Sequence, residues 1–208
     1  MSEFTSFVSK LRERVGAGGL APRVGEVGAK SVGDLRRAAV ALVLRGGFEG
    51  PELLVIKRSE AEHDHWSGHM ALPGGRVEPE DENLLATAAR ETFEEVGLDL
   101  GAGGEALARL GTVKPQSPYA PRVSVTPFVF VAPPAYHAAD GSKGLRLSGE
   151  VAAAFWVPVD ELKKGGRSAV FRMAFAGVER EWPAYPSQHG LIWGITERIL
   201  TEFLSLVD

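Results

Sequence analysis

Cysteine is absent from the 208 residues of this chain. Its absence excludes disulfide bonds, thiolate zinc sites, iron–sulfur clusters and cysteine nucleophiles. No apolar run approaches the ~18 residues that a membrane-spanning helix needs. Near the N-terminus, Lys10, Arg12 and Arg14 interrupt the apolar pattern that a secretory signal requires. We therefore expect a cytoplasmic protein with no membrane partner.

Basic residues are fewer than acidic residues. The 23 lysines and arginines face 27 acidic residues, so the formal net charge is −4. Because no basic tract stands out, nucleic acid is not expected as the main partner. An anionic substrate would therefore need local neutralisation. Hydrophobic residues make up 44% and charged residues 24%, which is typical of a globular protein.

Length and patterning predict one domain with an N-terminal extension. Apolar residues at helical spacing predict an amphipathic helix over residues 4–15. Six glycines over residues 16–33 indicate a linker. We therefore divide the chain into an N-terminal helix and linker, residues 1–33, and a domain, residues 34–208.

Within the domain, apolar runs predict strands before and after a central helix, with a further helix at the C-terminus. The predicted strands cover residues 37–44, 52–57, 107–113, 123–131, 152–157 and 170–175, and the predicted helices cover residues 83–96, 160–164 and 191–207. This order favours an α/β or α+β sandwich.

The most informative segment is acidic, with seven acidic residues and one basic residue from Glu78 to Glu95. On a helix, Glu91 lies three and four positions before Glu94 and Glu95, so three carboxylates share one face. Like charges at this spacing weaken a helix unless a cation offsets them. Carboxylate oxygens suit Mg²⁺ and Mn²⁺, often together with substrate phosphates. The segment predicts such a metal site, with a solvated acidic helix face as the alternative.

The spacing in this segment resembles the Nudix box. Residues 90–98 run Arg-Glu-x-x-Glu-Glu-x-Gly-Leu, and Glu82 lies eight positions before Arg90. The resemblance implies a Nudix-type α/β/α sandwich with a mixed central β-sheet. It also implies hydrolysis of a nucleoside diphosphate linked to another group, with Mg²⁺ or Mn²⁺ as the cofactor and a small nucleotide as the partner. A homodimer is compatible with it.

Two positions depart from the box. Thr92 stands where the family usually has an aliphatic residue, and six residues rather than five separate Gly75 from Glu82. Asp81 or Glu82 therefore fills the first acidic position of the box. The distance to Arg90 favours Glu82.

The resemblance also implies roles for individual residues. Glu94 and Glu95 are expected to be the principal metal ligands, with Glu91 as a third ligand or the group that orients water. Arg90 is expected to pair with a box carboxylate and hold its rotamer. Outside the box, Glu150 is the candidate general base, with a plain surface role as its alternative.

The candidates for substrate binding lie before and after the box. Gly74 and Gly75 would let the backbone approach the phosphates. Arg58 and His63 are candidates for phosphate or substrate contacts, and Tyr119 is a candidate for stacking on a base. A zinc site built from the histidines of residues 63–69 is a less favoured alternative.

Other stretches look like the coenzyme A pyrophosphatase branch of the family. They are residues 54–59, 72–75, 148–151, 155–158 and 192–200, and the similarity spans residues 35–206. The upstream motif of the branch is incomplete, because Ile56 replaces a threonine and His63 an arginine.

The first hypothesis is cleavage of coenzyme A or its thioesters into 3′,5′-ADP and a phosphopantetheine product. The alternatives are hydrolysis of ADP-ribose, a nucleotide sugar or a nucleoside triphosphate, and a Nudix-fold sensor that binds such a ligand without cutting it.

Overall fold

The computed structural model describes residues 2–16, 36–62, 67–116, 122–138, 144–175 and 178–208. The large sheet contains β1 (Arg36–Gly46), β2 (Pro51–Arg58), β3 (Met70–Ala71), β4 (Gly74–Arg76), β5 (Glu105–Arg109), β6 (Val123–Val131) and β7 (Val151–Pro158). The small sheet contains β8 (Ala169–Phe175), β9 (Val178–Ser187) and β10 (Gly190–Trp193). The helices are α1 (Glu3–Val15), α2 (Leu84–Val96), α3 (Val159–Gly165) and α4 (Gly194–Ser205), with a 3₁₀ turn, η1, at Pro134–Tyr136.

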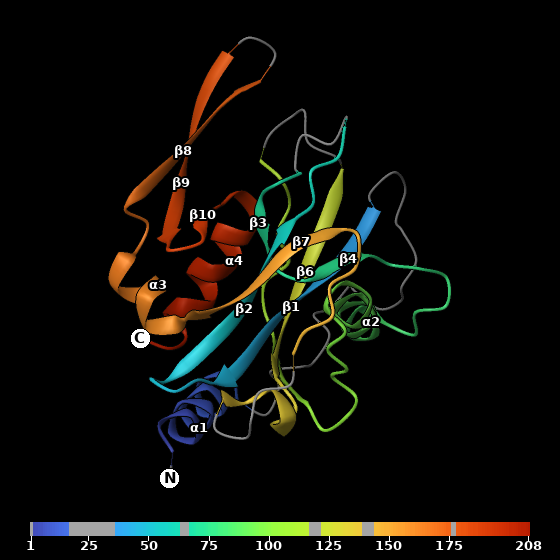
Figure 1. The fold of residues 1–208 in the computed structure, drawn as a ribbon, viewed down its shortest axis with the longest axis vertical. Helices are drawn as coiled ribbons and strands as arrows, with labels where there is room; N and C mark the ends of the chain where they lie inside the picture. The colour runs from blue at the N-terminus through green and yellow to red at the C-terminus, as the bar shows by residue number, and fades with distance from the viewer. Residues whose placement is uncertain (1, 17–35, 63–66, 117–121, 139–143, 176–177) are drawn as a thin grey trace.

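Within these residues the large sheet is mixed and has the order β3-β2-β1-β6-β5 (Figure 1). β4 pairs with β1, and β7 pairs with β2. The pair β1–β6 is parallel and runs without a register break from Arg36 opposite Val123 to Leu44 opposite Val131. The other pairs of this sheet are antiparallel.

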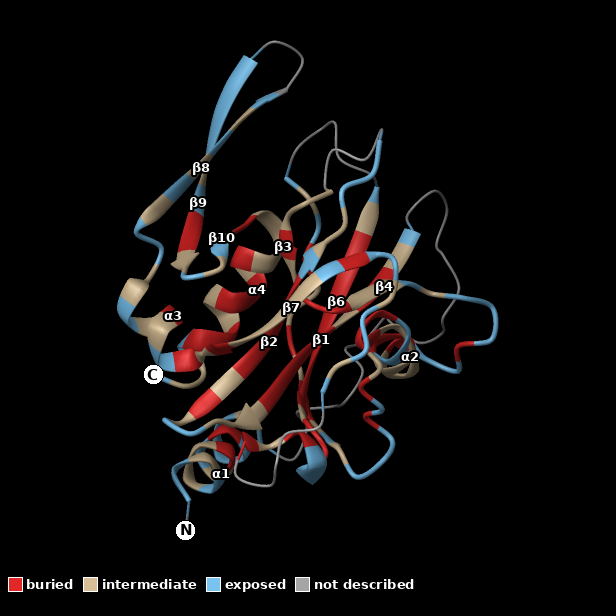
Figure 2. Ribbon diagram, in the orientation of Figure 1, coloured by how far each residue is buried: buried red, intermediate tan, exposed pale blue. Residues whose placement is uncertain are grey.

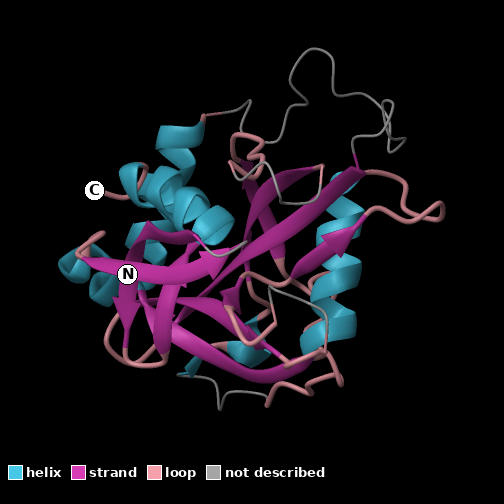
Figure 3. Ribbon diagram, turned by 90° about the horizontal axis from the view of Figure 1, so that it is seen from above, coloured by secondary structure: helices cyan, strands magenta, loops and turns pink. Residues whose placement is uncertain are grey.

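Two apolar cores lie on the two faces of the sheet, because successive strand residues point to opposite sides. In β1, Leu42 and Leu44 belong to one core, whereas Ala41 and Val43 belong to the other. Helices α1, α3 and α4 pack on the first face and α2 on the second. Figure 3 shows α2 on one side of the strands and the other helices opposite, and Figure 2 shows the buried residues along the central strands. The predicted α/β sandwich with a mixed central sheet is confirmed.

The N-terminal helix is packed into the first core. Leu11 is fully buried and Val8 nearly so, in the same cluster as Phe203 of α4. The Arg12 guanidinium also forms an ion pair with Glu105 of β5. This helix therefore contributes to the core of the domain, and the predicted linker lies almost entirely outside the described residues.

Several elements differ from the prediction. The predicted strand over residues 107–113 ends at Arg109, and Val113 forms only an isolated bridge with Val125. The predicted C-terminal helix begins at Gly194, because the apolar run before it forms β10. β3 and β4 are too short to give a periodic signal. The prolines and charges of β9 concealed that strand.

No helix among the described residues has the length and apolarity to cross a membrane.

Candidate active site

Helix α2 begins and ends at residues that cap it. The Asn83 side chain accepts a hydrogen bond from the Ala86 amide at 3.0 Å, and Gly97 adopts a left-handed conformation at φ 68°. Thr92, the unusual box residue, is buried, and its hydroxyl donates to the Ala88 carbonyl at 2.7 Å. This bond satisfies the polar atom of Thr92 where an aliphatic side chain was expected.

Arg90 joins the loop before α2 to the middle of the helix. Its Nε donates to Asp81 Oδ1 at 2.9 Å, and its Nη2 donates to Asp81 Oδ2 at 3.1 Å. The buried Asp81 carboxylate also accepts hydrogen bonds from the Glu78 amide and the Thr87 hydroxyl, each at 2.9 Å. The Arg90 guanidinium lowers the pKa of Asp81, so this carboxyl is ionised at neutral pH.

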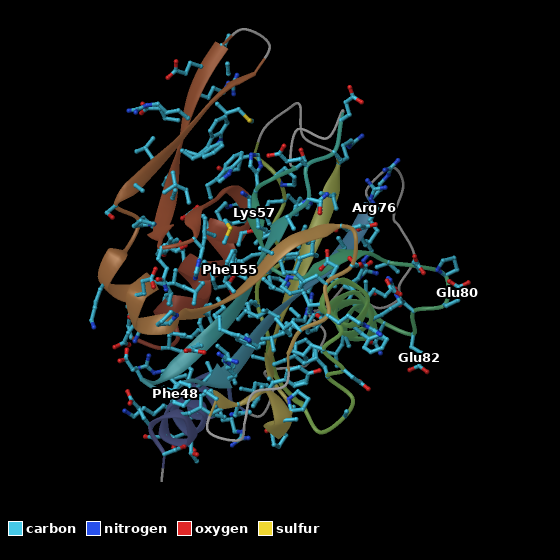
Figure 4. The ribbon with its side chains drawn as sticks, viewed as in Figure 1. Phe48, Lys57, Arg76, Glu80, Glu82 and Phe155 are labelled. Carbon is cyan, nitrogen blue, oxygen red and sulfur yellow. The ribbon has the colours of Figure 1, made fainter. Side chains whose placement is uncertain are left out.

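The two candidates for the first acidic position of the box differ in their contacts with Arg90. Asp81 pairs with Arg90, whereas Glu82 is exposed and points away from the body of the molecule, as does Glu80 (Figure 4). The reason is the turn in which the Asp81 amide donates to the Glu78 carbonyl at 3.1 Å. That turn directs Asp81 under the helix and leaves the next residue outside, which counting positions back from Arg90 did not reveal.

The Arg90 guanidinium also contacts two glutamates of its own helix. Nη1 donates to Glu94 Oε2 at 2.8 Å, and Nη2 donates to Glu91 Oε1 at 3.0 Å. Glu94 is exposed, whereas Glu91 is partly buried, and burial raises the pKa of Glu91. Arg90 therefore offsets the repulsion among like charges on this face of α2.

Glu95 faces the sheet rather than the solvent. It is buried, and its Oε2 accepts a hydrogen bond from the Gly74 amide at 2.9 Å. Burial raises the pKa of Glu95 to about 7. The charges of Glu91 and Glu150 also raise it, while the Gly74 amide and Arg58 act in the opposite direction. The structure thus places four other predicted site residues, Gly74, Glu91, Arg58 and Glu150, where they affect Glu95.

The two glycines of β4 leave no space for a side chain. A Cβ atom on Gly75 would lie 2.4 Å from the Glu91 carboxyl group. A Cβ atom on Gly74, whose φ is 151°, would lie 2.3 Å from the Ala39 carbonyl oxygen. The backbone of β4 therefore runs directly against the carboxylates of α2.

Arg58 and Glu150 reach the site from the ends of two paired strands. Arg58 ends β2 after a register shift against β7. The Ser59 amide donates to the Glu150 carbonyl at 2.8 Å, and the Ser148 amide donates to the Glu95 carbonyl at 2.9 Å. These bonds fix the Glu150 loop between β2 and the C-terminal end of α2, with the Glu150 side chain exposed.

His63 and Tyr119 are outside the described residues, so their roles stay predictions. His69, the one histidine of the proposed zinc alternative that is described, packs edge-on against Trp193, with ring centroids 4.9 Å apart.

Comparison with known proteins decides the family. The family model described as NUDIX domain matches residues 34–174. The chain belongs to the Nudix family. NudL of Enterobacter sp. (strain 638), an uncharacterised Nudix hydrolase, is 33% identical over 170 residues, which cover 80% of this chain and 81% of that protein.

Further similarities agree with this assignment. NudL of Photorhabdus laumondii is 30% identical over 182 residues, covering 86% of this chain and 89% of that protein. A solved MutT/nudix family protein from Enterococcus faecalis matches the fold with a TM-score of 0.52 at 18% identity, covering 100% of this chain and 76% of that one. The resemblance to the Nudix family is confirmed, and the chain is a Nudix pyrophosphohydrolase for nucleoside diphosphate-linked substrates.

Nudix hydrolases generally need divalent metal ions. The carboxylate groups present here are of the chemical type that binds such an ion. Glu91 and Glu95 offer carboxylate oxygens close enough for the charge of Glu91 to raise the pKa of Glu95. In the described part of the chain, no three carboxylate or imidazole groups surround a common point. Arg90 contacts Oε1 of Glu91 and Oε2 of Glu94, and each carboxylate has a second oxygen that an ion could bind.

Proposed function

We propose that this Nudix hydrolase cleaves the diphosphate of coenzyme A or an acyl-coenzyme A, giving 3′,5′-ADP and (acyl-)4′-phosphopantetheine. The position of Arg58 carries the proposal. On one side its charge acts on Glu95. On the other it lines a cavity of about 560 Å³. A diphosphate at the carboxylates thus lies beside a cavity large enough for the rest of an extended substrate.

Glu91, Glu94 and Glu95 would hold Mg²⁺ or Mn²⁺. Bound there, the ion neutralises the diphosphate and lowers the pKa of an attacking water. Arg90 keeps the carboxylates of Glu91 and Glu94 on the same side of α2 and, through Asp81, fixes the helix to the preceding loop.

The remaining steps of the proposed reaction involve water, the diphosphate and side chains of this protein. The oxygen of water forms a bond to one phosphorus, the bridging phosphorus–oxygen bond breaks, and the Glu150 carboxylate accepts the proton of the water. Glu150 suits this role because its loop is fixed by backbone bonds beside Glu95. Gly74 and Gly75 allow the phosphates to approach the backbone of β4, and Arg58 offers a charged donor to them.

The test is mass spectrometry of the products after incubation with coenzyme A and Mg²⁺ or Mn²⁺ in ¹⁸O-labelled water. Release of 3′,5′-ADP and 4′-phosphopantetheine supports the proposal, and the labelled product identifies the phosphorus attacked. Intact coenzyme A beside cleavage of ADP-ribose, a nucleotide sugar or a nucleoside triphosphate would overturn it. The Glu95→Gln variant is the control for a contaminating hydrolase.

A further inference from the structure

The cavity beyond Arg58 has a wall built by the small sheet and α4. Its lining includes parts of β2, β3, β8, β9 and β10 and the first turns of α4. The β8–β9 hairpin extends away from the large sheet, with exposed residues toward its far end (Figures 1 and 2). We name this space the Arg–Trp cavity for six of its lining residues: Arg58, Arg167, Arg180, Arg198, Trp182 and Trp193.

The charge of the cavity is opposite to that of the whole chain. Four arginines line it, and Glu197 is the one carboxylate among the described lining residues. The chain as a whole carries a net charge of −4. Such a local excess of guanidinium groups in a concave, partly apolar space favours an anionic ligand.

Two of the arginines are held in place. Arg167 Nε contacts Glu197 Oε1 at 2.7 Å, and Glu197 is 2% exposed. The Thr201 hydroxyl donates to the same Glu197 oxygen at 2.9 Å. Arg198 Nη1 donates to the Lys114 carbonyl at 2.6 Å. A guanidinium fixed in this way loses less side-chain entropy when it binds an anion, and it has further N–H donors to offer.

The aromatic side of the cavity is also rigid. Trp193 stacks on Phe171 with ring centroids 4.0 Å apart and planes at 11°. Trp182 lies against Trp193 at 5.3 Å, and its own side chain is only partly buried. His69 closes the cluster edge-on. A supported indole that still reaches a cavity is a surface on which a nucleobase stacks.

We propose that the Arg–Trp cavity binds the nucleotide end of the substrate, with the base on Trp182 and an additional phosphate, outside the cleaved diphosphate, on Arg180 and Arg198. This inference rests on the proposed hydrolase function for the position of the diphosphate beside Arg58. It selects nucleoside diphosphate derivatives that carry a further phosphate on the nucleotide. Coenzyme A has such a group at the 3′ position, whereas dephospho-coenzyme A and ADP-ribose lack it.

Binding of 3′,5′-ADP in the presence of EDTA tests the cavity without any hydrolysis. Calorimetry is expected to show that Arg180→Gln and Arg198→Gln each raise the Kd about tenfold, the effect of losing one charge-assisted contact. Arg172→Gln is the matched control, because Arg172 lies on the same hairpin, pairs with Glu181 and is absent from the described lining. Its Kd is expected to stay within about twofold of the wild type.

Two further measurements sharpen the test. Binding is expected to quench tryptophan fluorescence, and Trp182→Phe should remove most of that response. The ratio of kcat/KM for coenzyme A to that for dephospho-coenzyme A should fall in Arg180→Gln, whereas Arg172→Gln keeps the wild-type ratio. Unchanged Kd values in both cavity variants would overturn the inference. Inhibition of coenzyme A hydrolysis by 4′-phosphopantetheine but not by 3′,5′-ADP would also overturn the inference.

The two proposals fail separately. Hydrolysis of coenzyme A with no effect of the cavity arginines leaves the proposed function standing and removes the cavity assignment. Binding of 3′,5′-ADP that depends on Arg180, without hydrolysis of coenzyme A, leaves the cavity assignment standing and removes the proposed function.

Discussion

The acidic site on α2 and the Arg–Trp cavity have opposite excess charges, and each contains a group of the other sign that forms ion pairs. On α2, a single guanidinium, Arg90, contacts Asp81, Glu91 and Glu94. In the cavity, a single buried carboxylate, Glu197, pairs with Arg167 beside three other arginines. Each region thus keeps an excess of one sign, and in each a group of opposite charge, Arg90 or Glu197, fixes side chains without neutralising the whole.

This difference teaches how an acidic protein handles an anionic substrate. In the proposed function the acidic site needs a cation before a diphosphate can approach, whereas the proposed cavity would attract anions without one. Arg58 belongs to both, since it affects Glu95 and lines the cavity. Variants that damage one region while sparing the other therefore test whether the two act as separate parts.

The largest effect is expected from Gly74→Ala, which breaks the support beneath the acidic site. The new Cβ would lie 2.3 Å from the Ala39 carbonyl oxygen, and the φ of Gly74 is 151°. The free energy of unfolding should therefore fall by about 3–5 kcal/mol. Gly75→Ala should cost less stability, because the atom it meets belongs to the flexible Glu91 side chain. Urea unfolding measures both. Gly144→Ala, with nothing within 4 Å of its Cβ, is the control. Wild-type stability in Gly74→Ala would contradict the geometry of β4.

The next effect separates the two loop carboxylates. Asp81→Ala leaves Arg90 without its buried partner and should lower the free energy of unfolding by about 3 kcal/mol. Glu82→Ala, at an exposed position, should change it by less than about 0.5 kcal/mol. Equal losses in urea unfolding would restore Glu82 as the structural box carboxylate.

The pH dependence of the Asp81 contribution follows from its pKa. The pKa is lowered in the folded state relative to about 3.9 in the unfolded chain. The stabilisation is therefore complete above the unfolded pKa and is lost as the pH falls through the folded pKa. The stability difference between the wild type and Asp81→Asn should shrink below about pH 4.

Glu95→Gln should remove catalysis while sparing the cavity. An amide oxygen can still accept the Gly74 hydrogen bond, but the charge for the metal ion is gone, so turnover should fall about a hundredfold or more. The melting temperature in EDTA should not fall, because burial penalises the charged form. Binding of 3′,5′-ADP in EDTA should match the wild type. Loss of that binding would show that the two regions are not separable.

The smallest effect on turnover is expected at Glu150. If its carboxylate accepts the proton, Glu150→Gln should lower kcat by about tenfold or more near neutral pH. A wild-type kcat in Glu150→Gln would contradict the role of Glu150 as the general base. The exposed Glu80→Gln is the control.

The sequence predicted the parts of the molecule whose signals are local. Helix α2 starts one residue after the predicted position, because Asn83 caps the helix instead of beginning it. Its end agrees with the prediction, because Gly97 terminates it. The prediction for β6 matches its observed bounds, residues 123–131, since its apolar run is continuous. Gly74 and Gly75, which precede the helix, lie against Glu95 and Glu91 of the box.

What the sequence could not show depends on tertiary contact. Asp81 rather than Glu82 meets Arg90 because of one hydrogen-bonded turn that spacing does not encode. The cavity escaped prediction because Arg58, Arg167, Arg180 and Arg198 are scattered through the chain without a pattern. The packing of β10 against β3, and of α4 against β9 and β10, brings them to one cavity.

The parallel pairing of β1 with β6 has a consequence for how the chain reaches its native state. The β1–β2 hairpin forms from neighbours in sequence, but the other edge of β1 waits for residues more than eighty positions later. Non-local pairing of this kind slows folding. Until it is complete, a strand apolar on both faces presents an open edge to other chains. Refolding yield should therefore fall as protein concentration rises, with aggregation beginning at β1.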